Sequence, residues 1–165
     1  MSLTFTYQDI TTANCDYICH QVNCKGKMNS GVAKAIREKW PVVFDNYKTK
    51  IDAVGYQLRE NFLGTIQIVP LYEKDEKHQC VINMFAQNDY GYDGKRYTSY
   101  DAFWNCLNLI AHHVPKGSKI AFPCYIGCGR GGANWNVIKK MIDEVLGQDF
   151  TVVIFMWEAE LFEGI

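Results

Sequence analysis

The feature that most constrains the fold is a pair of glycine-bearing segments, each placed between an apolar run and a segment of helical period. "NCKGKMNSG" (23–31) follows the apolar run at 16–22 and precedes residues 32–40, whose apolar side chains recur every three to four positions. "GCGRGG" (127–132) follows the apolar run at 118–122 and precedes a second amphipathic segment. Two such units predict an α/β architecture.

The rest of the chain alternates in the same way and shows no internal repeat, low-complexity tract or linker. Strands are expected at 3–7, 16–22, 64–69, 80–86, 118–122 and 150–157, and helices at 32–40, 42–54, 98–114 and 134–146. A content of 48% hydrophobic residues is sufficient for a full core. Residues 1–165 are therefore expected to form a single domain.

Charge and hydropathy exclude two classes of partner. The formal net charge of −1 provides no basic field for a long nucleic acid, although it is compatible with a nucleotide-sized ligand. Apolar runs such as "TVVIFMW" (151–157) are far shorter than the ~20 residues that span a bilayer, and nothing resembles a signal peptide. We expect a cytoplasmic protein that does not bind membranes.

The cysteines do not indicate a disulfide or metal framework. The chain has seven, an odd number, and most lie in apolar runs where a thiol behaves as a small hydrophobic group. A zinc site could be assembled from Cys15, Cys19 and Cys24 with Cys124 and Cys128, but their spacings differ from the usual C-x2-C pairs. No metal and no cofactor are expected.

The two glycine-bearing segments have a chemistry in common. Glycine allows backbone amides to approach a ligand closely, and a helix N-terminus adds partial positive charge. Two such loops at the ends of adjacent strands would form a cleft for a diphosphate. The alternative is that these glycines only close tight turns.

A second interpretation of "CYIGCGR" (124–130) is a cysteine-dependent phosphatase, since Cys124 and Arg130 have the C-x5-R spacing. A thiolate at a helix N-terminus has a lowered pKa, and arginine binds phosphate through two hydrogen bonds. However, Pro123 stands where those enzymes place a histidine.

Nearly the whole chain resembles a macro domain, the ADP-ribose-binding module. The resemblance is carried by "QDIT" (8–11), by "VNCKG" followed by "SGVA" (22–33), and by "GCGRGGANW" (127–135). It implies a three-layer α/β/α fold with a mixed, mostly parallel central sheet. It also implies that Asp9 hydrogen-bonds the adenine amino group, that Ile10 packs nearby and that backbone amides of the second loop hold the diphosphate. The ligand-binding residues implied in the two loops are Asn23, Gly26, Ser30, Gly31, Val32, Ile126, Gly127, Cys128, Gly129, Arg130, Gly131 and Gly132.

Within the family, "HQVNCKGKMNSGVA" (20–33) is similar to the first loop of the small branch that removes phosphate from ADP-ribose 1″-phosphate. The resemblance implies a catalytic His20, which would assist proton transfer or position water, and an Asn23 that orients the distal ribose. A histidine can transfer protons near neutral pH. The alternative is that His20 is a buried structural histidine.

Two departures keep other functions open. The aspartate of the branch's "GGDW" is Asn134 here, which cannot act as a general base; a non-catalytic reader of ADP-ribose, or of ADP-ribosylated macromolecules, is therefore the alternative. Macro domains that hydrolyse ADP-ribosyl adducts carry a lysine after the central strand, whereas this chain reads "NMFAQ" (83–87) and places Lys95 further along. An ADP-ribosyl hydrolase is accordingly the less favoured alternative.

Aromatic side chains beside polar loops are candidates to stack on the adenine. These are Tyr90, Tyr92, Tyr125 and Trp157. Trp40, Trp104 and Trp135 lie at helical positions and are expected to pack in the core.

Overall fold

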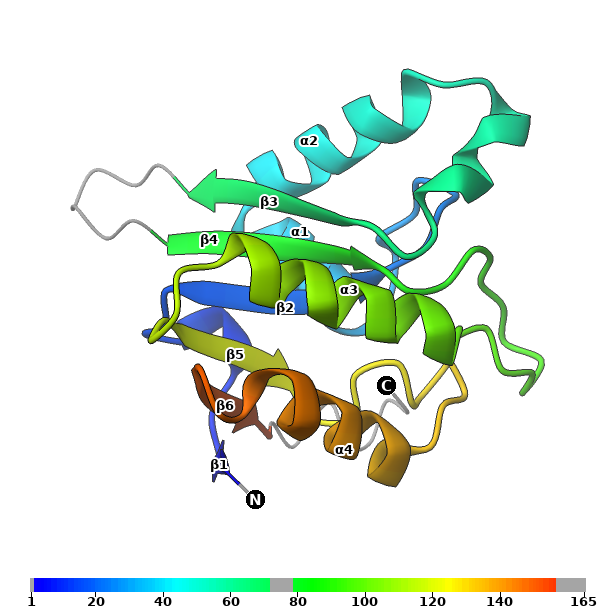
Figure 1. The fold of residues 1–165 in the computed structure, drawn as a ribbon. Coiled ribbons are helices and arrows are strands. Elements are labelled where there is room, and N and C mark those ends of the chain that lie inside the picture. The colour runs from blue at the N-terminus through cyan, green and yellow to red at the C-terminus, as the bar shows by residue number, and fades with distance from the viewer. Residues whose placement is uncertain (1, 72–78, 157–165) are drawn as a thin grey trace.

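The computed structural model describes residues 2–71 and 79–156 (Figure 1). Its strands are β1 (Leu3–Thr6), β2 (Tyr17–Val22), β3 (Ile66–Leu71), β4 (Gln79–Phe85), β5 (Lys119–Pro123) and β6 (Thr151–Phe155). Its helices are α1 (Gly31–Lys39), α2 (Pro41–Asp52), α3 (Tyr100–His113) and α4 (Trp135–Leu146), with 3-10 segments η1 (Ile10–Thr12) and η2 (Tyr56–Phe62). Every expected strand and helix is present; the two 3-10 segments were not expected.

The six strands form one sheet in the order β1-β6-β5-β2-β4-β3. All neighbouring strands are parallel except β3, which runs antiparallel to β4 at the edge of the sheet. The prediction of a mixed, mostly parallel sheet is confirmed. Parallel neighbours need crossover connections, which the helices supply.

Helices cover both faces of the sheet and produce three layers (Figure 1). Side chains of α3 and α4 share one buried cluster with Cys19 of β2, whereas side chains of α1 and α2 share another with Ile18 and Val22. Successive residues of a strand point to opposite faces, so β2 contributes to both clusters. The expected α/β/α arrangement is therefore confirmed.

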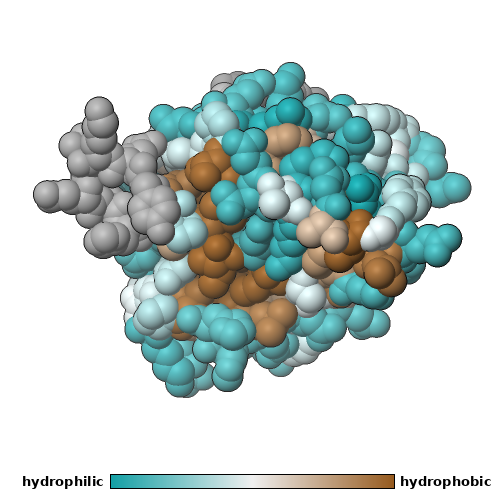
Figure 2. All heavy atoms as spheres, turned by 90° about the horizontal axis from the view of Figure 1, so that it is seen from above, coloured by the Kyte–Doolittle hydropathy of each residue, from teal (hydrophilic) through white to brown (hydrophobic). Residues whose placement is uncertain are grey.

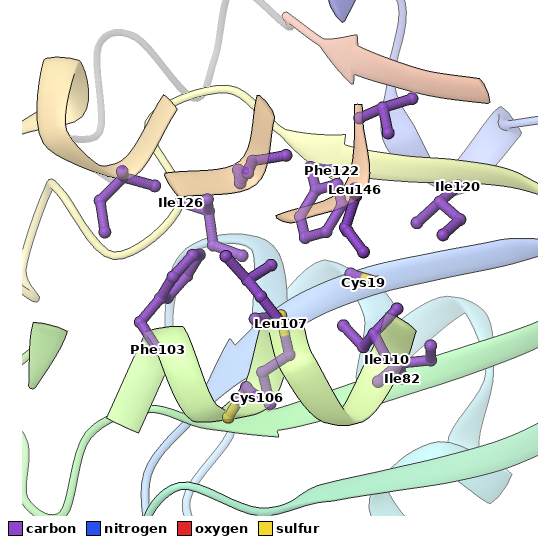
Figure 3. Close-up of a cluster of buried hydrophobic side chains, with 14 of the residues drawn as sticks. Cys19, Ile82, Phe103, Cys106, Leu107, Ile110, Ile120, Phe122, Ile126 and Leu146 are labelled. Atoms are coloured by element: carbon purple, nitrogen blue, oxygen red, sulfur yellow. The ribbon is translucent and has the colours of Figure 1, made fainter. Parts of the chain in front are cut away.

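Figure 3 shows how the cluster beneath α3 and α4 is filled. Phe103, Leu107 and Ile110 of α3 point toward Phe122 of β5 and Leu146 of α4, and all five side chains are fully buried. Removing a buried phenylalanine side chain costs about 3–5 kcal/mol, so a truncation here would affect the whole fold rather than the site alone.

Local sequence explains where the helices begin. α2 starts at Pro41, whose fixed backbone angle suits the first helical position. The side chains of Ser99 and Asn134 accept hydrogen bonds from the amides of Ala102 and Asn136, so they cap α3 and α4.

The edge strand β3 borders the face seen in Figure 2, which looks down on the molecule from above Figure 1. Hydrophobic side chains form bands there between hydrophilic ones. Ile68 of β3 is partly exposed, while Pro70 lacks the amide hydrogen that a further strand would use. Among the described helices, none has the length and hydrophobicity to cross a membrane.

The sheet opens between β2 and β5, and this opening positions the site. β2 pairs with β4 along six positions but with β5 at only two, Tyr17 opposite Ile120 and Ile18 opposite Ala121. The two strands therefore separate toward their carboxyl ends, where ligands bind in open α/β sheets.

Candidate functional site

A pocket lies where β2 and β5 separate. It encloses about 1000 Å³ of empty space, part of which is open to solvent. Three parts of the chain form its wall: residues 20–23 and 27–33, the segment after β4 with Gln87 and residues 90–92, and the end of β5 with the second glycine loop. Both glycine loops thus contribute to one pocket.

The structure brings most of the predicted site residues together in this wall. Those that line the pocket are His20, Asn23, Ser30, Gly31, Val32, Ile126, Gly127, Arg130 and Gly131. Gly26, Cys128, Gly129 and Gly132 belong to the same two loops but do not line the described pocket. Asp9 and Ile10 are not among the residues that line it: Ile10 packs in the same buried cluster as the pocket residues Val22 and Val32, and the Asp9 carboxylate accepts a hydrogen bond from the amide of Thr11.

The Asn23 side chain shapes the first loop. Its Oδ1 accepts from the amides of Lys25 and Lys27 at 3.0 and 3.3 Å, and its Nδ2 donates to the carbonyl of Lys27 at 2.9 Å. The buried Tyr47 hydroxyl lies 2.8 Å from the same Oδ1 and accepts from the amide of Gly26. Because an amide nitrogen has two hydrogens, one donor of Asn23 has no partner among the described residues.

The N-terminus of α1 opens into the pocket without a side-chain cap. Ser30 occupies the N-cap position, but its side chain makes no capping hydrogen bond, unlike the capping residues of α3 and α4. Ser30, Gly31, Val32 and Ala33 all line the pocket. The unpaired amides and partial positive charge of a helix N-terminus favour an anion at this position.

The second loop presents backbone amides on the opposite wall. Gly127 has a φ of +73°, a conformation that favours glycine. The amides of Gly127, Gly129, Arg130 and Gly131 make no hydrogen bond to any described group. The carbonyl of Gly131 accepts from the amides of Tyr97 and Thr98, both at 2.9 Å, and these bonds hold the loop against the segment before α3.

Gln21, Gln87 and Thr98 form a network that the sequence reasoning missed. The Thr98 hydroxyl donates to the carbonyl of Gly127 at 2.8 Å and accepts from Nε2 of Gln21 at 2.7 Å; the same Nε2 donates to Oε1 of Gln87. The network ties β2 and the segment after β4 to the second loop. The three residues are far apart in sequence, and no local pattern could have indicated their contact.

His20 is 1% exposed and lines the pocket from β2. Its Nε2 lies 2.5 Å from Oδ1 of Asn83, and its Nδ1 has no partner among the described residues. Burial lowers the pKa of His20 from its ordinary 6.5 to about 4, against the opposing effect of the hydrogen bond to Asn83. The imidazole is therefore neutral at pH 7.

The aromatic candidates separate into three groups. Tyr90 and Tyr92 line the pocket, and the guanidinium of Arg130 lies 4.0 Å from the ring centroid of Tyr92. Tyr125 packs on Trp135, with ring centroids 5.6 Å apart. Trp157 lies outside the described residues.

The geometry contradicts a cysteine-dependent phosphatase. Cys124 is buried in the cluster beneath α3 and α4, whereas Arg130 is exposed and lies against Tyr92. Within residues 2–71 and 79–156, no three metal-ligating side chains are grouped to hold a metal ion.

Asn134 lies outside the pocket wall. Its exposed side chain caps α4, and its backbone amide donates to the Tyr100 hydroxyl at 2.8 Å. The residue at this position therefore acts on the helix N-terminus in the observed structure.

Comparison with known proteins identifies relatives along most of the chain. An "ADP-ribose 1″-phosphate phosphatase" of Aspergillus oryzae is 23% identical over 175 residues, which covers 82% of this chain and 84% of that protein. The macrodomain of Mycobacterium tuberculosis DarG has a TM-score of 0.75 at 19% identity, over 93% of this chain and 96% of that one.

A DarTG protein of Thermosipho africanus, solved in complex with ADP-ribose, has a TM-score of 0.76 at 17% identity, over 94% of this chain and 41% of that one. The model of the macro domain family matches residues 19–142, which include both glycine loops, α1 and the first part of α4. The chain belongs to the macro domain family.

Proposed function

We propose that this macro domain binds ADP-ribose in the pocket between β2 and β5 and hydrolyses the phosphate of ADP-ribose 1″-phosphate. One observation carries the proposal. Backbone amides without hydrogen-bond partners among the described residues lie at the N-terminus of α1 and in the second glycine loop, and both groups border the pocket that His20 also lines. Its membership of the macro domain family supports the same ligand.

The diphosphate is assigned to the space between the two loops. The amides of Gly127, Arg130 and Gly131 are the donors on one side, and the uncapped first turn of α1 provides positive potential on the other. Lys27 and Arg130 are the cationic side chains of the described wall and add long-range attraction.

The two ends of the ligand are assigned from the remaining residues. Asp9 and Ile10 would hold the adenine, since η1 packs against α1 and β5, two elements that contribute residues to the pocket wall. Asn23 has one amide hydrogen available for a hydroxyl of the distal ribose. Tyr90 and Tyr92 complete the wall on the side of β4.

In the proposed reaction, one water attacks the phosphorus of the 1″-phosphate and the bond between phosphorus and the 1″-oxygen breaks. His20 accepts a proton from the attacking water and then returns a proton, by way of solvent, to the leaving 1″-oxygen. His20 is neutral again at the end, and ADP-ribose and inorganic phosphate are the products. A neutral imidazole at pH 7 is in the form that can accept a proton. The name of the Aspergillus oryzae relative supports this reaction.

Calorimetry with ADP-ribose and phosphate release from ADP-ribose 1″-phosphate test the two parts separately. His20→Ala should lower phosphate release by about 10²–10⁴-fold while the affinity for ADP-ribose changes little, because a proton-transfer group acts on the reaction rather than on binding. His112→Ala, at the solvent-exposed end of α3, is the matched control. Absence of binding at millimolar ADP-ribose would overturn the proposal.

The alternative is a reader that binds ADP-ribose, free or on a macromolecule, without hydrolysis. Position 134 favours it, because the side chain there is a neutral amide engaged in capping α4. Tight binding with no phosphate release would support the reader, and Asn134→Asp is then the substitution to test for turnover.

A further inference from the structure

A row of polar side chains crosses three strands on the sheet face covered by α1 and α2. His20 of β2 lies directly opposite Asn83 of β4, and Asn83 lies directly opposite Gln67 of β3. His20 and Asn83 are almost completely buried, with apolar neighbours such as Ile18, Val22 and Phe85 on the same face. Burying a polar group costs folding free energy unless its hydrogen bonds are made, so the hydrogen bonds within this row are expected to be functionally or structurally required.

The direction of every hydrogen bond in the row follows from one fixed acceptor. The backbone carbonyl of Asn46 in α2 accepts from Nε2 of Gln67 at 3.2 Å, which leaves Oε1 of Gln67 facing Asn83. That oxygen accepts from Nδ2 of Asn83 at 3.1 Å, which leaves Oδ1 of Asn83 facing His20. An amide oxygen can only accept, so Nε2 of His20 must donate.

We infer that Asn83, with Gln67 behind it, is a positioning residue that holds neutral His20 in the tautomer with its hydrogen on Nε2 and its lone pair on Nδ1. The inference about the tautomer concerns the unliganded protein; its consequence for turnover rests on the proposed phosphatase activity.

The fixed tautomer determines what His20 can do. Nδ1 has no partner among the described residues, while His20 lines the pocket. With its hydrogen on Nε2, the ring offers Nδ1 as the acceptor for the proton of the attacking water. The other tautomer would place a hydrogen on Nδ1 and remove that acceptor. The cross-strand row therefore connects the edge strand β3 to the chemistry of the pocket.

Nitrogen-15 NMR of the full chain, labelled on histidine and free of ligand, measures the tautomer directly. The chain has four histidines, and His20→Gln identifies the His20 signals by their loss. At pH 7 we expect a protonated, pyrrole-type Nε2 and an unprotonated, pyridine-type Nδ1. An Nδ1-protonated ring or an imidazolium would overturn the inference, whatever the protein hydrolyses.

Variants of the row test its cause. Asn83→Leu should produce a mixture of tautomers and lower kcat by about 10–100-fold with little change in KM, by analogy with the loss seen when the partner that orients a metal-binding histidine is removed. Asn83→Asp keeps an acceptor oxygen opposite Nε2 and should preserve the Nε2-protonated form. Gln67→Leu, on the partly exposed edge strand, should also mix the tautomers and serves if Asn83→Leu does not fold.

Gln79→Leu is the matched control. It removes an amide from the same strand β4, but that amide donates to the carbonyls of Ala13 and Cys15, away from His20. It should lower stability without changing the His20 signals. An unchanged tautomer in Asn83→Leu and Gln67→Leu would overturn the positioning role, even if the protein releases phosphate. If the protein releases no phosphate, the proposed function fails, and the NMR spectra still decide the inference about the tautomer.

Discussion

His20 combines two properties that oppose each other: it can carry a charge, and it is buried. It is a titratable side chain, yet it is only 1% exposed, and burial lowers its pKa to about 4. Burial disfavours the imidazolium, and Asn83 offers only a neutral acceptor, which compensates for part of that cost. The side chain that the sequence predicted for proton transfer therefore also makes the free energy of unfolding depend on pH.

The pH dependence of stability tests this directly. The pKa of His20 is lower in the folded chain than its ordinary 6.5, so the unfolded chain binds a proton first and stability falls as the pH drops from 6.5 toward 4. One pKa unit is about 1.4 kcal/mol, so the loss approaches about 3 kcal/mol below pH 4. His20→Gln keeps a donor toward Asn83 but cannot titrate, and urea unfolding should show a flatter profile over this range. Equal slopes in both proteins would contradict the buried neutral histidine.

Gly127 both lines the pocket and has a backbone conformation that favours glycine. Its φ is +73°, and an added Cβ would lie 2.8 Å from Oε1 of Gln21 and 3.1 Å from the Thr98 hydroxyl. Gly127→Ala should destabilise the protein by about 1–3 kcal/mol and weaken ADP-ribose binding, because it strains the loop and disturbs the network that holds it.

Gly117→Ala is the control for backbone strain alone. Gly117 has a φ of +88°, nothing lies within 4 Å of the added Cβ, and the residue is in the turn before β5. It should cost stability and leave ADP-ribose affinity unchanged. Calorimetry and chemical unfolding of the two variants separate the effects, and equal affinities would remove Gly127 from the diphosphate site.

Among the helices, α1 differs from α3 and α4 in how it begins. The latter two satisfy an amide of their first turn with their own capping side chains, whereas the Ser30 side chain does not. A helix that leaves its N-terminus uncapped at a pocket gives up stability that an anion can restore. α2 also lacks a side-chain cap but does not line the pocket, so α1 is the described helix whose uncapped N-terminus faces the expected ligand.

Ser30→Asp should therefore change stability and affinity in opposite directions. A carboxylate at the N-cap accepts from the first-turn amides and raises the free energy of unfolding by about 0.5–1 kcal/mol. The same charge occupies the position proposed for the diphosphate and should weaken ADP-ribose binding at least tenfold. Ser99→Asp places an equal charge at the N-cap of α3, a helix that does not line the pocket, and should leave the affinity unchanged. Tighter or equal binding by Ser30→Asp would place the anion elsewhere.

Across the whole chain, the sequence predicted what depends on local pattern. Helical and strand periods located the strands and α-helices of the described residues but not the 3-10 segments η1 and η2. The two loops, with the resemblance they carry, indicated the family and the pocket wall. The row from His20 to Gln67 and the network around Thr98 were not predicted, because each depends on strand register between segments far apart in sequence. Asn23 was predicted as a ligand residue, but its extensive bonding within its own loop could be found only from coordinates.

The pocket joins segments from residue 20 to residue 131, so occupying it should stabilise the molecule as a whole. A ligand at 100 times its Kd raises the free energy of unfolding by about 2.7 kcal/mol, which corresponds to roughly 5–10 °C in Tm for a protein of this size. Thermal unfolding with ADP-ribose should show this shift. AMP and ribose 5-phosphate at the same concentration should shift Tm much less, because each leaves half of the proposed contacts unmade. Ser30→Asp should show a reduced shift with ADP-ribose from a higher starting Tm. Equal shifts with AMP and ADP-ribose would mean that the adenine end alone is bound, and would separate the two glycine loops from recognition of the diphosphate.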